Sequence, residues 1–373
     1  MTGKERITRL LRGESIDRVA LTTLIDGVGG ATRKEFSEEY KNMPSMEFYK
    51  RLGYDIFCFG NYGLEKWAMY PYTIRCGAGE YSCTTANDGT VTEKRTIGKK
   101  NITGISKGHP IKYPVETTED LKTLIEYYQA QEVIVFGGEE LEQCRQSMRA
   151  LKEDIGQYGI YTAAFPQSGV QTMLEYECGL ENFYYLLADE PELVKQAIEL
   201  IQDIRRKEHL ALLEYMDADI VIPVENTSIL LTSPDIYRRY TLDHIREYTE
   251  AAHKHGKLSV VHMCGNLKGL LNEFKAAGID GIHALTPPPV GDCPFEDALD
   301  VLGDELVAIV GFDGAVIHDP KATRESIDEL VKSTLTPRIK NARFIHAVGA
   351  DGISTPVWKF EAVRDSVEKY GKI

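Results

Sequence analysis

The sequence of 373 residues predicts an α/β protein, a (β/α)8 TIM barrel with a β-hairpin inserted after the second strand. Short β-branched apolar runs alternate with longer segments of helical periodicity, which is typical of βα units around a parallel sheet. Eight such runs can be counted, the number of strands in a TIM barrel. No linker rich in Pro, Gly or Ser interrupts the pattern. We therefore expect residues 1–373 to form a single TIM-barrel domain.

The eight expected strands all contain β-branched or aromatic residues, and they are followed by longer amphipathic segments. These strands are Val19–Ile25, Tyr54–Gly60, Gly159–Phe165, Ala218–Val224, Leu258–Met263, Gly281–Leu285, Leu306–Gly311 and Arg343–Val348. The helices expected between them include Pro191–Met216, Pro234–His255 and Leu267–Ala277. Proline suits the first turn of a helix, because its missing N–H has no partner there in any case.

Residues 70–113 break this alternation. Thr, Ile and Val alternate with polar residues on both sides of the turn sequence Asn87-Asp88-Gly89, which predicts a β-hairpin or small meander inserted after the second strand. Two interpretations are open. The insertion is either a flap without a role, or a lid or docking surface over the barrel mouth, where functional loops of this fold gather.

Composition and charge exclude several classes of protein. The chain has no run of about 18 apolar residues, and its amino terminus is polar, so we expect a cytoplasmic protein without a membrane segment or signal peptide. The net charge of −14 argues against a nucleic-acid partner, which would favour a basic surface. The seven cysteines are widely scattered, a pattern typical of reduced thiols rather than of a disulfide framework.

Polar residues follow almost every expected strand, where the active site of a TIM barrel lies. Asp26 and Glu225 are candidate catalytic groups, because each carboxylate ends an apolar strand at the predicted mouth. Candidate substrate-binding residues are the other polar side chains at these ends, namely Asn61, Gln167, Asn226, Asp313 and Asp351.

The fifth strand ends in His262-Met263-Cys264. Side chains alternate along a strand, so positions 262 and 264 point to the same side. An imidazole and a thiolate presented together are good zinc ligands, although a third or fourth ligand must come from elsewhere. The alternative is structural, with the histidine hydrogen-bonded and the cysteine packed.

Glu225 ends the fourth strand, next to the fifth. There it could bind the metal, act as a general acid or hold a substrate hydroxyl; the alternative is a solvent-exposed cap of the following turn. His346 is the other open candidate, since it lies in the eighth strand close to the mouth.

Four segments together resemble the uroporphyrinogen decarboxylase superfamily. They are the opening helix and strand entry Glu5–Val19, the strand end His262–Leu267, and the segments Gly278–Asp292 and Val310–Gly314. The resemblance runs nearly from end to end of the chain and implies the TIM-barrel fold.

The resemblance also separates two branches of the superfamily. The decarboxylases carry an early RQAGRY segment for the porphyrinogen carboxylates, whereas here the corresponding stretch has only Arg33 and Lys34. The zinc methyltransferases resemble this chain at His262-x-Cys264 but add a second cysteine after the last strand, and residues 347–353 contain none. The resemblance therefore leaves the third ligand among Glu225, Asp351 and His346, and nearness to His262 favours Glu225. The missing cysteine suggests a methyl donor other than a cofactor thiol.

The function that the resemblance implies is methyl transfer. Zinc would act as a Lewis acid on a small methylated donor, a methyl ether (possibly an aryl O-methyl group) or a thioether, and the methyl group would pass to a reduced corrinoid. That corrinoid (cobalamin) would come on a separate corrinoid protein, because we find no cobalamin domain in this chain. One alternative is a metal-independent decarboxylase of a small carboxylic acid that uses Asp26 and Arg33. Another is an accessory protein whose barrel only binds a ligand.

Overall fold

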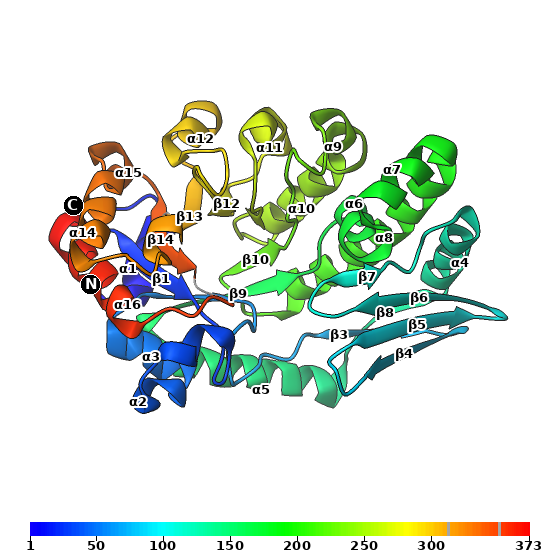
Figure 1. The fold of residues 1–373 in the computed structure, drawn as a ribbon, viewed down its shortest axis with the longest axis horizontal. Coiled ribbons are helices and arrows are strands. Elements are labelled where there is room, and N and C mark those ends of the chain that lie inside the picture. The colour runs from blue at the N-terminus through cyan, green and yellow to red at the C-terminus, as the bar shows by residue number, and fades with distance from the viewer. Residues whose placement is uncertain (312–313, 350–351) are drawn as a thin grey trace.

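The computed structural model describes residues 1–311, 314–349 and 352–373. Within them, eight parallel strands surround the centre of the molecule (Figure 1). Seven lie inside stretches that the sequence predicted as strands, and β14 extends one residue beyond the predicted Arg343–Val348. They are β1 (Ala20–Leu24), β2 (Ile56–Phe59), β9 (Gly159–Phe165), β10 (Ile220–Pro223), β11 (Val260–His262), β12 (Gly281–Leu285), β13 (Val307–Gly311) and β14 (Phe344–Gly349).

The strands follow one another around a ring. Hydrogen bonding gives one array in the order β1-β14-β13-β12-β11 and a second in the order β10-β9-β2. A parallel bridge between Val224 and His262 joins β10 to β11. Between β2 and β1, the Asp55 N–H donates to the Leu21 carbonyl at 2.7 Å. The predicted eight-stranded barrel is therefore confirmed, with a weaker seam at β1 and β2 than elsewhere.

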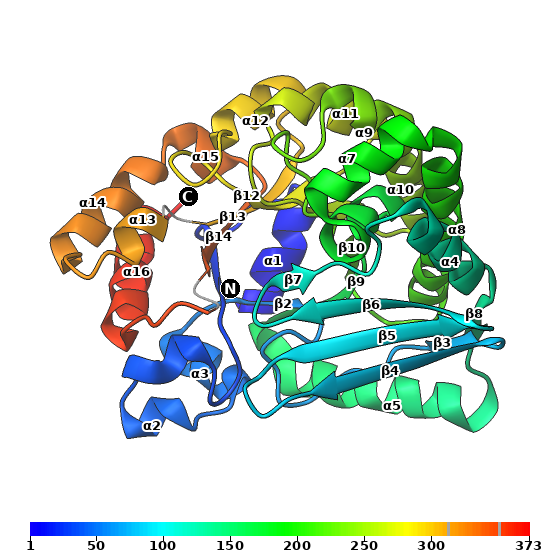
Figure 2. The same ribbon diagram turned by 45° about the vertical axis from the view of Figure 1, so that its right-hand side comes forward.

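Helices cover the outside of this ring and form an arc around the strands (Figure 2). In chain order they are α2 (Glu38–Lys41), α3 (Ser45–Leu52), α5 (Gly138–Ile155), α6 (Gly169–Thr172), α7 (Gly179–Asp189), α8 (Pro191–Tyr215), α9 (Pro234–Tyr240), α10 (Leu242–Lys254), α11 (Leu271–Ala277), α12 (Phe295–Leu302), α13 (Gly314–Ile317), α14 (Arg324–Thr334), α15 (Pro337–Asn341) and α16 (Val357–Tyr370). Short 3-10 turns are η1 (Ala31–Glu35), η2 (Gly156–Tyr158) and η4 (Lys268–Leu270), and η3 (Met173–Glu177) is a π-helical turn. The helix predicted over 234–255 is divided at Thr241, whose φ of −122° interrupts the helical backbone. In the described part of the chain, no helix is both long and apolar enough to span a membrane.

The insertion after β2 is larger than the sequence predicted. It contains β3 (Tyr72–Cys76) and an antiparallel meander of β4 (Gly79–Thr85), β5 (Val91–Ile97), β6 (Lys100–Ser106) and β7 (Pro110–Lys112). After helix α4 (Thr118–Gln129), strand β8 (Gln131–Val135) returns to pair with β3. The sequence did not reveal β8, because this short strand follows a helix directly and stays half-exposed. The whole insertion projects from one side of the barrel (Figure 1).

A buried ion pair fastens the meander to the barrel. Arg95 of β5 places Nη1 at 2.7 and 2.6 Å from the two carboxylate oxygens of Glu177 in η3. The Tyr128 hydroxyl of α4 donates to the same carboxylate at 2.9 Å. Glu177 is 1% exposed, so removing either partner would leave a buried charge uncompensated. The insertion is therefore held firmly against the loop that follows β9.

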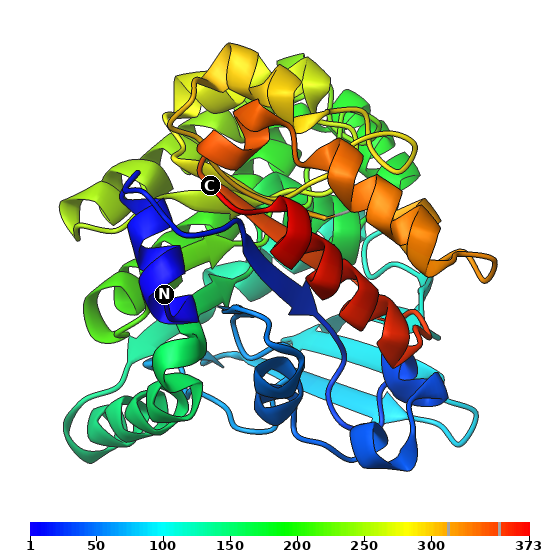
Figure 3. The ribbon, with the colours of Figure 1, turned by 90° about the vertical axis from the view of Figure 1, so that its left-hand side faces the viewer.

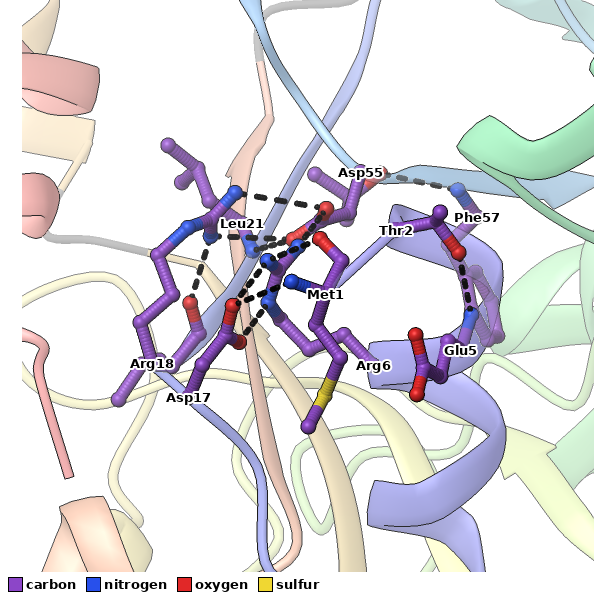
Figure 4. A network of polar contacts seen from close by, with 11 residues as sticks. Met1, Thr2, Glu5, Arg6, Asp17, Arg18, Leu21, Asp55 and Phe57 are labelled. Carbon is purple, nitrogen blue, oxygen red and sulfur yellow. Dashed lines mark hydrogen bonds and ion pairs between the residues drawn. The ribbon is translucent and has the colours of Figure 1, made fainter.

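Helix α1 (Gly3–Leu11) closes the amino-terminal end of the barrel, where its Ile7 and Leu10 pack among the inward side chains of the strands. A network of ion pairs surrounds it (Figure 4). Asp55, at the start of β2, contacts Arg6 of α1 and lies 3.1 Å from Arg18 Nη1, while Asp17 also pairs with Arg6. Both termini lie on this side of the molecule (Figure 3). The opening segment of the resemblance thus serves the fold of the barrel rather than its mouth.

Candidate active site at the barrel mouth

The carboxyl ends of the strands form an open funnel. Below it, the inward side chains are fully buried and aliphatic, such as Ile222 and Ile309. One step further along each strand, the inward residues are only half-buried: Leu24, Phe59, Ala164, Val224, His262, Gly311 and Ala347. Within these seven described residues, His262 supplies the one ionisable side chain, and the others are apolar or lack a side chain. The eighth strand, β12, contributes the buried imidazole of His283, whose ring stacks on Phe59 at 4.5 Å. The funnel therefore presents a pair of imidazoles on an apolar wall, and His262 is the more exposed of the two.

His262 is held from two sides. Its Nδ1 lies 2.7 Å from Nδ1 of His283 on the neighbouring strand β12, and its ring lies 5.1 Å from the ring of Phe59. Burial lowers the pKa of His262 to about 4. The imidazole is therefore neutral near pH 7, the state in which a histidine binds a metal.

Cys264 follows two residues later and is exposed. Its Sγ lies 3.7 Å from Oδ1 of Asn226, which has a left-handed backbone with φ of 50°. Asn226 thus turns its amide from the end of β10 towards the end of β11. The structure brings together one predicted substrate-binding residue and one predicted metal ligand.

A carboxylate that the sequence analysis missed completes this cluster. Glu175 in η3 accepts hydrogen bonds from Gln167 and Gln171, each at 2.8 Å, and from Asn226 at 3.4 Å. Burial raises its pKa, and the amide donors offset part of that effect. Because it lies in a π-helical turn well beyond β9, inspection of strand ends could not find it, although π-turns often mark functional sites. The available signal was the spacing Gln171-x3-Glu175, which places two polar groups on one helical face.

The structure gives Glu225 a different position from the one expected. Its carboxylate is buried and accepts from the Ser168 backbone N–H at 2.9 Å and from the Ser168 hydroxyl at 2.6 Å. Those donors follow β9, so the carboxylate is engaged with the loop on the β9 side of its strand. Burial raises the pKa of Glu225 to about 7, although the Ser168 donors act in the opposite direction. Strand adjacency thus places the Glu225 backbone N–H 2.9 Å from the His262 carbonyl, while Ser168 holds the side chain, and the role of Glu225 as a metal ligand stays a prediction.

Asp26 also serves the structure of the mouth. Its two oxygens accept hydrogen bonds from Thr32, from the Gly352 backbone and from the Tyr62 hydroxyl. The carboxylate thereby ties together the loops after β1, β2 and β14. Arg33 is 1% exposed, and its guanidinium donates to carbonyls and to a serine hydroxyl of its own loop region. A decarboxylase that uses Asp26 and Arg33 would therefore have to release both groups from these bonds.

The remaining candidates are distributed as follows. Asn61 is paired through both amide atoms with the backbone of Ala68, so it fixes the start of the insertion. His346 is fully buried and packs 4.3 Å from the ring of Phe344, two residues earlier, so both point to the outside of β14, away from the funnel. Asp313 and Asp351 lie outside the described residues.

Two donors at the end of β11 suit a zinc ion. A neutral imidazole and an exposed thiol are the donor types that zinc prefers, and His262 and Cys264 provide both at one strand end. Among the described residues, no group of three His, Cys, Asp or Glu side chains is arranged to hold a metal ion. The pair fits two positions of a zinc site, and the third protein ligand stays a prediction.

The fold and the polar groups at its mouth are those of a (β/α)8-barrel enzyme. In such enzymes the active site forms at the carboxyl ends of the strands. Residues 102–370 match the family described as uroporphyrinogen decarboxylase (URO-D). Since this match covers more than half of the sequence, the chain belongs to the uroporphyrinogen decarboxylase family.

A solved structure supports the fold. A methyltransferase from Methanosarcina mazei superposes with a TM-score of 0.57 at 15% sequence identity and covers 99% of both chains. A D-psicose 3-epimerase from Clostridium cellulolyticum H10 gives a TM-score of 0.35 at 9% identity, over 60% of this chain and 82% of that one, which is too low to support an argument. No curated protein sequence matches this chain.

Proposed function

We propose that this protein is a zinc-dependent methyltransferase that moves a methyl group from a small methylated donor to the corrinoid of a partner protein. The donor would be a methyl ether, including an aryl O-methyl group, or a thioether. One observation carries the proposal: the exposed thiol of Cys264 follows the neutral, half-buried imidazole of His262 at the mouth of a barrel of this family. The fold shared with the Methanosarcina mazei methyltransferase is consistent with it.

His283 has a specific part in this proposal. When His262 donates its Nδ1 proton to His283, the lone pair of His262 lies on Nε2, and that nitrogen would bind the zinc. The hydrogen bond of 2.7 Å would fix both the tautomer and the orientation of the ring, as second partners of metal-binding histidines commonly do. Cys264 would supply the thiolate, and Glu225 and Asp351 are the candidates for the third position.

When bound, zinc would supply Lewis acidity to the heteroatom of the donor. Transfer breaks the bond between the methyl carbon and that heteroatom, and the electron pair stays on the heteroatom, which afterwards takes a proton. Leu24, Phe59 and Val224 would line the apolar funnel around the methyl group and limit access of water to it.

Exposed apolar side chains around the mouth favour the docking of a protein partner. Large apolar side chains on loops after six strands are exposed, with Trp67 at 70%, Leu230 at 71% and Val290 at 62% exposure. The other members of this rim are Val28, Tyr62, Tyr176 and Ile353. Apolar side chains exposed around an active-site opening mark interaction surfaces. A corrinoid protein that docks there would bring its cofactor to the funnel.

The test compares Cys264→Ser with Cys83→Ser, which alters another exposed cysteine, on β4 of the insertion. Metal analysis of the purified wild type should give about one zinc per chain. A reduced free corrinoid would serve as methyl acceptor, and its absorbance change would report transfer from a panel of methyl ethers and thioethers. We expect Cys264→Ser to lose zinc and transfer and Cys83→Ser to keep both. Full zinc and full transfer in Cys264→Ser would refute the proposed site.

A further inference from the structure

In the described part of the chain, two residues other than glycine have a left-handed backbone, and both flank the strand that carries His262. Asn226 follows β10 with φ of 50°, and Ala284 lies in β12 with φ of 68°. Backbone strain of this kind gathers at functional sites, because only the surrounding structure can hold it. The short polar side chain of asparagine eases this conformation, whereas alanine has no such help. The strain at Ala284 therefore has a cause in its surroundings.

Ala284 is the extra residue of a β-bulge. Up to His283, β12 pairs residue by residue with β13. The next pair is Leu285 with Val310, so Ala284 has no partner in the ladder. The Thr286 hydroxyl donates to the Ala284 carbonyl at 2.8 Å. A bulge shifts the alternation of side chains by one residue from that point onward.

This shift decides which way Leu285 points. His283 faces the funnel, where its ring stacks on Phe59 at 4.5 Å. In a regular strand Leu285, two residues later, would face the same way. With the bulge it faces outward: it is fully buried in the apolar cluster that contains Val310, its ladder partner, and side chains of the outer helices. Burial of a whole leucine side chain offsets the strain of one left-handed alanine.

The position that Leu285 avoids lies next to the proposed metal ligands. His262 of β11 is in register with His283. Extended by two residues, that register sets position 285 beside Cys264, whose thiol is exposed. A leucine side chain that faced inward there would cover the His283 ring and narrow the approach to the thiol. Ala284, which is half-buried, carries only a methyl group.

We propose that the bulge at Ala284 determines the donor specificity of the barrel mouth. By keeping Leu285 out of the funnel, it admits a methyl donor with a branched or cyclic group on its heteroatom to the Cys264 side of the site. A donor whose heteroatom carries only methyl groups needs no such space. The direction of Leu285 stands on the fold alone, and its effect on donors rests on the proposed function.

The first measurement needs neither zinc nor a donor. It compares the alkylation of Cys264 by iodoacetamide and by the bulkier N-phenylmaleimide, in metal-free protein that carries Cys83→Ser to remove the other exposed thiol. Valine disfavours a left-handed backbone, so Ala284→Val should restore regular alternation and turn Leu285 into the funnel. We expect its reaction with N-phenylmaleimide, relative to that with iodoacetamide, to slow at least about tenfold. Ala284→Gly suits the bulge and should react like its parent.

A second substitution identifies the cause of that slowing. Adding Leu285→Ala to Ala284→Val removes the obstructing side chain and should restore the reaction with N-phenylmaleimide. A merely structural defect at Ala284 would become worse when a buried leucine is also lost, so failure of the rescue would overturn the inference. A further variant decides even if Ala284→Val does not fold. Leu285→Cys, with Cys264 and Cys83 both changed to serine, should resist both reagents, and rapid alkylation would show that position 285 faces the funnel.

The last measurement is donor selectivity with a reduced free corrinoid as acceptor. It compares dimethyl sulfide with isobutyl methyl sulfide, whose isobutyl group is the side chain of leucine. The wild type should use both, and Ala284→Val should lose the larger donor selectively, by at least about tenfold in the ratio of kcat/KM values. A wild type that accepts only dimethyl sulfide would overturn the inference and leave the proposed function intact. No transfer from any donor, with the expected alkylation pattern, would refute the methyltransferase and leave the direction of Leu285 established.

Discussion

The two ends of the barrel use their polar residues in opposite ways. At the amino-terminal end, Arg6, Asp17, Arg18 and Asp55 pair with one another, and α1 covers the strands beneath them. At the mouth, His262 is half-buried and Cys264 is exposed on an apolar funnel. The amino-terminal end therefore stabilises the barrel, whereas the mouth presents side chains close to the surface. Substitutions at the two ends should separate stability from activity.

The largest effect is expected at the closed end. Asp55→Ala removes a carboxylate that is 3% exposed and leaves the guanidinium of Arg6, with 5% exposure of its side chain, without its buried partner. Breaking a buried ion pair in this way costs about 3–5 kcal/mol. Urea unfolding should show this loss as a lower midpoint, while transfer activity per folded molecule stays unchanged. A variant as stable as the wild type would mean that the network contributes nothing to closing the barrel.

The second effect is expected at the mouth. His262→Ala and Cys264→Ser should each lower methyl transfer by at least about 100-fold. Substitution of a residue that only orients a metal ligand already lowers metal affinity or activity by about 10- to 100-fold. Both residues are at least partly exposed. In the metal-free protein, Cys264→Ser should therefore change the free energy of unfolding by no more than about 1 kcal/mol. Assaying activity and unfolding on the same preparations checks both halves. Loss of folding with retained specific activity would reverse the contrast between the two ends.

The sequence predicted the barrel strands better than the roles of the side chains at their ends. All eight barrel strands follow from β-branched runs, because burial on both sides of a parallel strand selects such residues. The carboxyl ends of these strands then indicated where to look for a site. Strand order does not reveal rotamers, however. Glu225 ends the strand next to His262, yet its carboxylate binds Ser168.

The roles that the sequence did not reveal depend on contacts distant in sequence. Glu175 gains its importance from Asn226, 51 residues later, and Asp26 from Gly352, 326 residues later. His346 is a residue that the sequence overrated. It lies in β14 near the mouth, but the alternation of side chains along the strand places it on the outside of the barrel. Motif inspection finds residue types at strand ends, and only the packed structure shows which of them already have internal partners.

The third prediction tests the new position of Glu225 through pH. Its pKa in the folded protein is about 7, above the ordinary value of 4.5, so folding favours the protonated form. The wild type should lose this contribution to stability as the pH rises from about 4.5 to about 7. Glu225→Gln resembles the protonated group and should be more stable than the wild type at pH 8 by about 1–3 kcal/mol, with little difference at pH 4.5. Unfolding midpoints at the two values check this.

Zinc content of the same variant decides the older hypothesis. If Glu225 only accepts hydrogen bonds from Ser168, Glu225→Gln keeps its metal and its activity. Loss of zinc in Glu225→Gln would return this residue to the ligand set and show that the side chain turns towards His262 when the metal binds.

The smallest effect is expected for Asp26→Asn, which alters the mouth without touching the funnel. Burial alone would raise the pKa of Asp26, but hydrogen bonds from Thr32, Gly352 and Tyr62 hold it below its ordinary value of 3.8. An amide cannot accept all of these bonds, so we expect a loss of about 1 kcal/mol at pH 7. Because a lowered pKa stabilises the folded protein only while the group is ionised, the difference from the wild type should shrink as the pH falls below 3.8. Unfolding midpoints measured at pH 7 and pH 3 test this sign, and a difference as large at pH 3 as at pH 7 would show that Asp26 acts through its shape rather than through its charge.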